Sequence, residues 1–292
     1  MSTLLADGLV KQLRESASYR LSAIVEMARL SEADRQSLQT RHARSAWPLL
    51  GQPQYANIRE VGPWLFSAGA DADLQAQYDF HHALTKSGAE GLCGWLISAM
   101  PSADLAVHLG HAATARGPDG HLYLLRFHTE FAFPVLYARQ DLPGVRQWLA
   151  PIRAWWLLQP HPERSAWRHY AGPDLPAGAD VPDMVLDQAC WDALAGDPFT
   201  CGIADRLRDA MIAAGQKPPC HGVQLAKVAG LLAEARARGL TRLQDLSDYV
   251  VLVGLSGRLL RGAPDWEQAV AQAGTAGKPL AAALAAALPQ MR

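Results

Sequence analysis

His108 and His111 lie three residues apart in a segment whose apolar residues recur at helical spacing. Two imidazoles at this spacing can bind one metal ion from the same face of a helix. A metal site also needs a third ligand and groups that orient the first two. His128 is available, but nothing in the sequence brings it close to the pair. We therefore interpret the two histidines as residues of a polar helix face and expect no metal.

Cys93, Ser98 and Cys220 are the candidate nucleophiles of this chain. Cys93 lies inside an apolar run, whereas a reactive thiol needs partial exposure and a lowered pKa. Ser98 ends the same run without the small flanking residues of the G-x-S-x-G turn that exposes a hydrolase serine. Cys220 precedes His221, but adjacent side chains rarely face each other productively. No phosphate loop or dinucleotide fingerprint is present, so we expect no enzyme activity and no cofactor.

Arg126 is the charged residue that most needs an explanation, because it interrupts the apolar run LYLLRF. A buried guanidinium needs a carboxylate or several carbonyls as partners. Glu26 and Glu130 are the candidate carboxylates. Two interpretations stay open. Arg126 and these acids could bind a partner protein's backbone or carboxylate, or they could form a structural ion pair that ties two strands together. We favour the structural ion pair.

Nine tryptophans concentrate in the first part of the chain. Most must belong to the core, because aromatic side chains bury a large apolar area. Aromatic residues are also enriched at the energetic centres of protein interfaces. Exposed tryptophans would therefore mark a binding surface, and Trp64 and Trp156 are our candidates for it.

The elements that must position these residues are clearest between Gly91 and Gln140. Residues 91–98 form a continuous apolar run that predicts a strand buried on both faces. Pro101 ends it, Ser102 is a good helix N-cap, and helical spacing follows. A Gly-Pro-Asp-Gly turn leads into residues 121–127, a second predicted buried strand, and a helix capped by Thr129-Glu130 comes next. We expect a β-α-β unit in a parallel or mixed sheet.

Outside this segment, the first part of the chain alternates predicted strands and helices. The strands expected are Tyr19–Ala28, Pro63–Ala68, Arg153–Leu158 and Trp167–Tyr170, the last as an antiparallel edge. The helices expected are Ser31 to about Ala43, Ala72–Lys86 and Arg146–Ala150.

Residues 172–182, GPDLPAGADVP, are rich in Pro and Gly and hold little to bury, so we place a domain boundary there. Everything beyond reads as helix. Leu246, Tyr249, Val250 and Val253 follow the i, i+3, i+4, i+7 pattern of an amphipathic helix, for which Thr241 and Gln244 offer a capping box. We predict an α/β domain with a mixed sheet flanked by helices at residues 1–172, and an all-helical domain at residues 183–292.

Composition excludes several classes of function. The chain has 292 residues and 49% apolar content, enough for a large core. Its 27 basic and 28 acidic residues nearly cancel without a long basic run, which argues against nucleic acid and anionic lipid as partners. No stretch approaches the ~20 apolar residues of a membrane span, and the N-terminus lacks signal-peptide features. The four cysteines fit free thiols. We expect a cytoplasmic protein.

Five short motifs follow one another along the chain: Trp47-Pro48-Leu49-Leu50, Gly62-Pro63-Trp64-Leu65, Gly94-Trp95-Leu96-Ile97-Ser98, His108-Leu109, and Asp119-Gly120 leading to Leu125-Arg126-Phe127. Their order and spacing resemble the adaptor chaperones of bacterial type VI secretion, a family long catalogued as a domain of unknown function. The resemblance spans roughly Tyr19 to Gly172, and a looser helical similarity continues to the C-terminus. Two positions depart from the family: His128-Thr129-Glu130 stands where an Asp-Pro pair is usual, and Glu26 stands where the first strand usually ends in Asp.

The resemblance implies a non-enzymatic adaptor that binds a secreted effector protein and assists its loading onto the spike tip protein of the secretion machine. The absence of a catalytic constellation in the sequence agrees with this. One alternative is a hydrolase or transferase whose site is assembled from residues remote in sequence. The other is a regulatory interaction protein unrelated to secretion.

Overall fold

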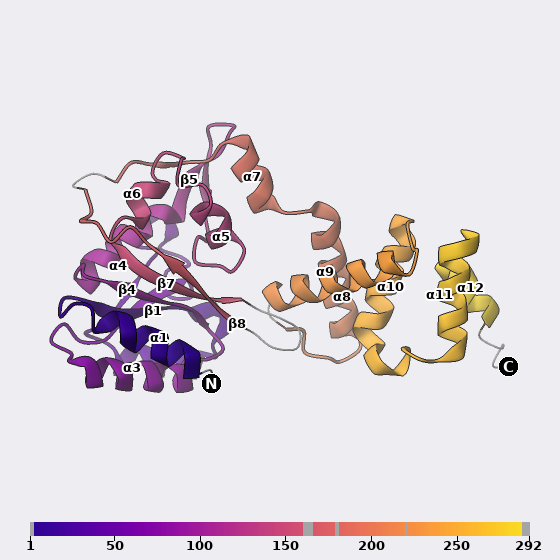
Figure 1. Cartoon of the computed structure of the whole chain (residues 1–292), viewed down its shortest axis with the longest axis horizontal. Coiled ribbons are helices and arrows are strands. Elements are labelled where there is room, and N and C mark those ends of the chain that lie inside the picture. Colours follow the sequence, from indigo (N-terminus) through magenta and orange to yellow (C-terminus); the bar gives the residue numbers. More distant parts are fainter. Residues whose placement is uncertain (1–2, 160–165, 179–180, 220, 288–292) are drawn as a thin grey trace. The chain divides into compact units, whose positions relative to one another are not determined.

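The computed structural model describes residues 3–159, 166–178, 181–219 and 221–287 (Figure 1). The chain divides into two compact units, an α/β unit that ends at Leu194 and a helical unit that begins at Ala195. This confirms the predicted α/β class followed by an all-helical region.

The main sheet of the α/β unit has six strands in the order β2-β3-β1-β4-β7-β8, and all neighbouring strands are antiparallel. The central strand β1 pairs with β3 on one side and with β4 on the other, and Glu26 lies opposite Pro63. The strands are β1 (Arg20–Glu26), β2 (Ala46–Pro48), β3 (Pro63–Ser67), β4 (Leu92–Ser98), β7 (Ile152–Gln159) and β8 (Ala166–Ala171).

The predicted parallel β-α-β unit is wrong. After β4 and helix α4 (Ser102–Gly110), the chain enters a separate three-stranded sheet of order β6-β5-β9. Its strands are β5 (Thr114–Arg116), β6 (Leu122–Leu124) and β9 (Met184–Val185). Of the expected buried strand 121–127, only the three residues of β6 are strand, and Leu122 and Leu124 are exposed. The tight turn pairs β6 with β5 and leaves β6 as an edge strand of this small sheet, so its leucines stay in contact with solvent.

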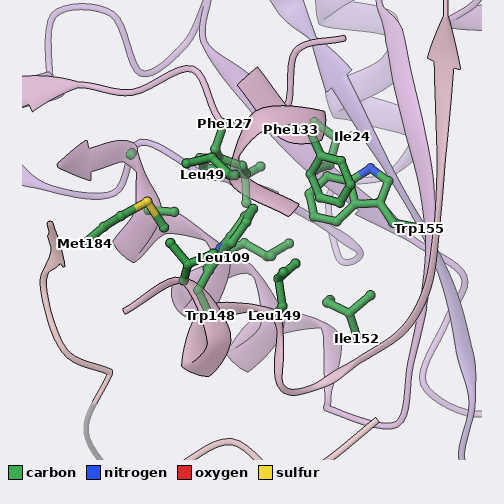
Figure 2. Packing of buried hydrophobic residues seen from close by; sticks show 14 of the residues in the cluster. Ile24, Leu49, Leu109, Phe127, Phe133, Trp148, Leu149, Ile152, Trp155 and Met184 are labelled. Carbon is green, nitrogen blue, oxygen red and sulfur yellow. The ribbon is translucent and has the colours of Figure 1, made fainter. Parts of the chain in front are cut away.

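The two faces of the main sheet carry separate cores. On one face, α1 (Thr3–Leu13) and α3 (Leu74–Ser87) cover side chains such as Ala23 and Val25. On the other face, α4, α5 (Ala132–Tyr137) and α6 (Val145–Leu149) pack over Ile24 and Leu96. Figure 2 shows side chains of this second core. Successive β1 residues alternate between the faces, so Glu26 shares the face of Ile24.

Helix starts follow local capping only in part. Ser31 and Asp73 accept hydrogen bonds from backbone N–H groups at the starts of α2 (Glu32–Arg41) and α3. Ser102 is not a cap: it is the first residue of α4, and its Oγ lies 2.6 Å from Ser67 Oγ. The predicted capping box at Thr241 also fails, because Arg242 is the N-cap residue of the following helix, with no side-chain cap.

Residues 172–178 follow strand β7 rather than standing free as a connector. The backbone N–H groups of Gly172, Asp174 and Leu175 donate to carbonyls of residues 153, 152 and 150. The chain then adds β9 and α7 (Gln188–Ala195) to the α/β unit, with Met184, Leu186 and Cys190 in its core. The unit boundary therefore differs from the expected one at residues 172–183. Met184, Leu186 and Cys190 extend the α/β unit beyond the Pro/Gly-rich segment. Three apolar residues scattered in this way do not stand out in the local composition, so the sequence did not reveal them.

The helical unit contains α8 (Pro198–Ala213), α9 (His221–Ala237), α10 (Leu243–Ser256), α11 (Pro264–Ala276) and α12 (Leu280–Ala287). The predicted apolar stripe of α10 is confirmed, because Leu246, Tyr249, Val250 and Val253 are all buried in its core. Within the described residues of both units, no helix has the length and apolar character that crossing a membrane requires.

Candidate functional site

Glu26 is a buried acid at the end of the central strand. Its backbone N–H donates to the carbonyl of Gly91 at 2.8 Å, which holds the strand end in place. Its side chain is 5% exposed and lies on the face of β1 that also carries Ile24. A carboxylate buried this deeply needs partners that compensate for the lost water.

Two side chains from the segment after β6 supply those partners. Arg126 Nη2 donates to Glu26 Oε2 at 2.6 Å, and His128 Nε2 lies 2.8 Å from the same oxygen. His128 is 1% exposed, whereas Arg126 is 56% exposed. The expectation that Arg126 lies buried within a strand is therefore wrong. It follows β6, and the buried charge of the pair is Glu26.

The partners determine how the site titrates. Burial alone would raise the pKa of the Glu26 carboxyl, but the hydrogen bond from His128 and the charge of Arg126 lower it to about 2. Burial lowers the pKa of His128 below its ordinary value, against the opposing effect of Glu26. The His128 ring is therefore neutral, and its Nε2–H donates a hydrogen bond to the ionised carboxylate of Glu26. Its Nδ1 is buried and has no hydrogen-bond partner among the described residues.

Glu26, Arg126 and His128 line a hollow of about 230 Å³. The remaining wall is almost wholly apolar, and it comes from the segment before β3 and from the end of β6. Val61 and Leu124 are themselves exposed, so apolar surface surrounds the charged group. The other lining residues are Ala28, Leu50, Ile58, Val61, Gly62, Pro63, Leu124, Leu125 and Phe127.

Glu130, the other predicted acid partner of Arg126, takes a different cation. Its Oε2 lies 3.7 Å from Arg29 Nη2. Of the three predicted charged residues, the structure thus joins Glu26 and Arg126 directly and gives Glu130 to a separate ion pair. Arg29 follows Glu26 by three residues, and Glu130 follows His128 by two, so two pairs of opposite charge connect the same two segments.

Trp64 and Trp156 lie away from this group. Both pack against the core on the opposite face of the main sheet. Trp64 Nε1 donates to the carbonyl of Arg59, and Trp156 Nε1 donates to Gln12 Oε1 of α1. The face follows from the strand register, because Trp64 pairs with Val25, the neighbour of Glu26 on β1.

His108, Cys93 and Ser98 have structural roles, and Cys220 lies outside the described residues. His108 is buried, contrary to the expected polar face, and its Nε2 lies 2.8 Å from the carbonyl of Trp148. Burial raises the pKa of the Cys93 thiol to about 12, as expected for an inert core cysteine. Ser98 Oγ donates to the carbonyl of Pro151. Across the described part of the chain, no three His, Cys, Asp or Glu side chains gather where they could hold a metal.

His128 is a site residue that the sequence did not predict, since it suggested only a possible third metal ligand and a departure from the adaptor family there. The apolar wall from Leu50 to Gly62 was also missed, because this segment has no helical or strand periodicity. A usable signal was present: His128 stands two residues from Arg126, the residue that needed a partner.

Residues 21–147 match the model of a protein family described as Domain of unknown function (DUF4123). The match covers Glu26, Arg126, His128 and the whole wall of the hollow, which lies between residues 26 and 128. No curated protein and no solved structure matches the chain.

Proposed function

We propose that this protein is a non-enzymatic adaptor chaperone that binds a type VI secretion effector in the cytoplasm and assists its loading onto the spike tip protein. Two observations support the proposal. The family match covers residues 21–147, and this is the region whose motifs resemble adaptor chaperones of type VI secretion. The same region contains the hollow around Glu26.

The hollow is the observation that carries the proposal. Well-packed protein interfaces centre on a few pockets that receive anchoring side chains and exclude water. This hollow has apolar walls, an exposed apolar rim at Val61 and Leu124, and an exposed guanidinium at Arg126. A stable complex needs about 800 Å² of buried surface on each partner. The surface around the hollow would supply that area, and the hollow would receive an anchoring side chain of the partner.

The same geometry argues against general base catalysis. A catalytic base works best with a pKa near the working pH, whereas the pKa of Glu26 is lowered to about 2. His128 is oriented by a carboxylate, as in a catalytic triad. However, its Nδ1, the nitrogen that would act as the base, is buried without a partner among the described residues. These facts support a binding role.

Co-expression tests the proposal. The chain should copurify with an effector encoded beside its gene, and it should raise the soluble yield of that effector. Deletion of the gene should reduce effector secretion. Normal effector solubility and secretion after the deletion would contradict the proposal.

A further inference from the structure

We propose that the hollow at Glu26 receives one tryptophan or tyrosine side chain of the partner, whose N–H or O–H donates to Glu26 Oε1. This inference rests on the proposed binding function and names the group that is bound. It comes from the hydrogen-bond pattern of the carboxylate, from the size of the hollow and from the surrounding charges.

The carboxylate of Glu26 has one oxygen to spare. Arg126 and His128 both contact Oε2, and within the described chain no hydrogen bond reaches Oε1. Glu26 is almost fully buried, ionised at neutral pH and part of the wall of the hollow. An ionised carboxylate can accept several hydrogen bonds. The geometry thus offers an acceptor for a donor that enters the hollow.

The size and walls of the hollow select the body of the occupant. Sites for small molecules typically enclose about 300–1,000 Å³, and this hollow is smaller, at about 230 Å³. That volume suits one large side chain. Walls such as Leu50, Ile58 and Pro63 favour an apolar body. An apolar body with a single polar donor describes tryptophan and tyrosine, which are also enriched at interface anchors.

The neighbouring charges exclude a charged occupant. Arg126 already lies 2.6 Å from Glu26 Oε2, so a lysine or arginine head group would meet a guanidinium. A carboxylate would meet Glu26 itself. The second pair, Arg29 with Glu130, adds one charge of each sign. A neutral donor satisfies Oε1 without repulsion from either partner.

Small probes test the inference without the effector. N-acetyl-tryptophanamide, N-acetyl-tyrosinamide and N-acetyl-phenylalaninamide share a backbone and differ in the donor on the ring. Titrations of the full chain, followed by NMR, should show the tryptophan and tyrosine probes binding about tenfold tighter than the phenylalanine probe, as expected for a hydrogen bond to a charged group. Equal affinities for the tyrosine and phenylalanine probes, or no binding of the two donor-bearing probes, would overturn the inference.

A matched pair of variants locates the binding. Ala28 is exposed and lines the hollow, so Ala28→Phe should occlude it and abolish probe binding. Ala83 is an exposed alanine on α3 outside the hollow, and Ala83→Phe should bind the probes like the wild type. Probe binding that survives in Ala28→Phe would place the site elsewhere. Probe binding without effector copurification would instead leave the inference intact and contradict only the proposed function.

Discussion

His81 and Glu26 are two buried titratable side chains on opposite faces of the main sheet, and their surroundings treat them differently. On the face covered by α1 and α3, His81 is 2% exposed, and neither of its ring nitrogens has a partner among the described residues. On the other face, Glu26 is equally buried but accepts hydrogen bonds from Arg126 and His128. Burial lowers the pKa of His81 to about 4, and the partners lower the pKa of Glu26 to about 2.

Burial and hydrogen-bond partners have different effects on the charge of a titratable side chain. Burial without partners keeps His81 neutral, with its ring 4.6 Å from that of Trp95, so it behaves as a core aromatic residue. Burial with partners keeps Glu26 charged. A charged acid in the wall of a hollow can accept a hydrogen bond from a partner, whereas the neutral ring of His81, on the buried side of α3, offers no charge to one.

At pH 7, the largest effect should come from His128→Leu, which removes the buried partner of Glu26. The neutral His128 ring gives a hydrogen bond to a buried charged group, and losing such a bond costs about 1.5–3 kcal/mol. We expect a loss of this order in the free energy of unfolding at pH 7, measured by urea denaturation. The pKa of Glu26 is lowered from 4.5 in the unfolded chain to about 2 in the folded protein. The stability that ionised Glu26 contributes is therefore complete above pH 4.5 and is lost as the pH falls to about 2. The deficit of the variant should shrink over that range.

His121→Leu is the matched control, because His121 is exposed close by in sequence. It should change the stability at pH 7 by less than about 0.5 kcal/mol. Equal stabilities of His128→Leu and His121→Leu would show that Arg126 by itself compensates the carboxylate.

His81→Leu should act in the opposite direction and stabilise the protein. It removes two buried nitrogens without partners, worth about 1 kcal/mol at pH 7. The pKa of His81 is depressed from 6.5 to about 4, so the wild type loses stability as the pH falls through that range. The titration adds about 3 kcal/mol by pH 4, so the advantage of the variant should grow to roughly 4 kcal/mol there. Denaturation curves at pH 7, 5.5 and 4 measure it.

The exposed neighbour gives the control for this change. His82→Leu should change the stability at pH 7 by less than about 0.5 kcal/mol, because His82 is exposed. A constant difference between His81→Leu and the wild type at the three pH values would mean that the buried ring titrates normally.

The sequence predicted the main strands because their signal is local. Continuous apolar runs bounded by Gly or Pro located Pro63–Ser67 and Leu92–Ser98 within a few residues. The run at residues 121–127 has similar letters but a different outcome, since burial depends on what packs above a strand. The burial of residues 121–127 depends on the hairpin that β6 forms with β5 and on the pairing of β5 with β9, which are tertiary contacts.

The candidate site was half predictable for a similar reason. A lone arginine in an apolar run demands an acid, and Glu26 was one of the two acids considered. The contact between Glu26 and His128 joins residues 102 positions apart, and a single histidine has no periodicity that would reveal it. Placing Trp64 and Trp156 on the opposite face would have required the strand register, which tertiary pairing sets.

The smallest effect on stability should come from Arg126→Met, although the sequence favoured a structural ion pair at this residue. Arg126 is 56% exposed, and Glu26 keeps its hydrogen bond from His128 when the guanidinium is gone. Water screens an exposed pair, so the expected loss is at most about 1 kcal/mol. That corresponds to a fall of about 2–4 °C in Tm, which differential scanning calorimetry resolves.

Arg126→Met also divides the two interpretations that the sequence left open. If the residue contacts the effector, the variant should fold with nearly the wild-type Tm and copurify with less effector. Arg126→Lys is the control, because it keeps the charge but loses the planar fork of N–H donors. Effector binding that survives in Arg126→Lys would assign the role to charge, and binding lost in both variants would assign it to the fork. If Arg126→Met lost as much stability as His128→Leu, Arg126 would stabilise the buried Glu26 carboxylate as strongly as His128 does. The expected difference between the exposed partner and the buried partner of Glu26 would then be wrong.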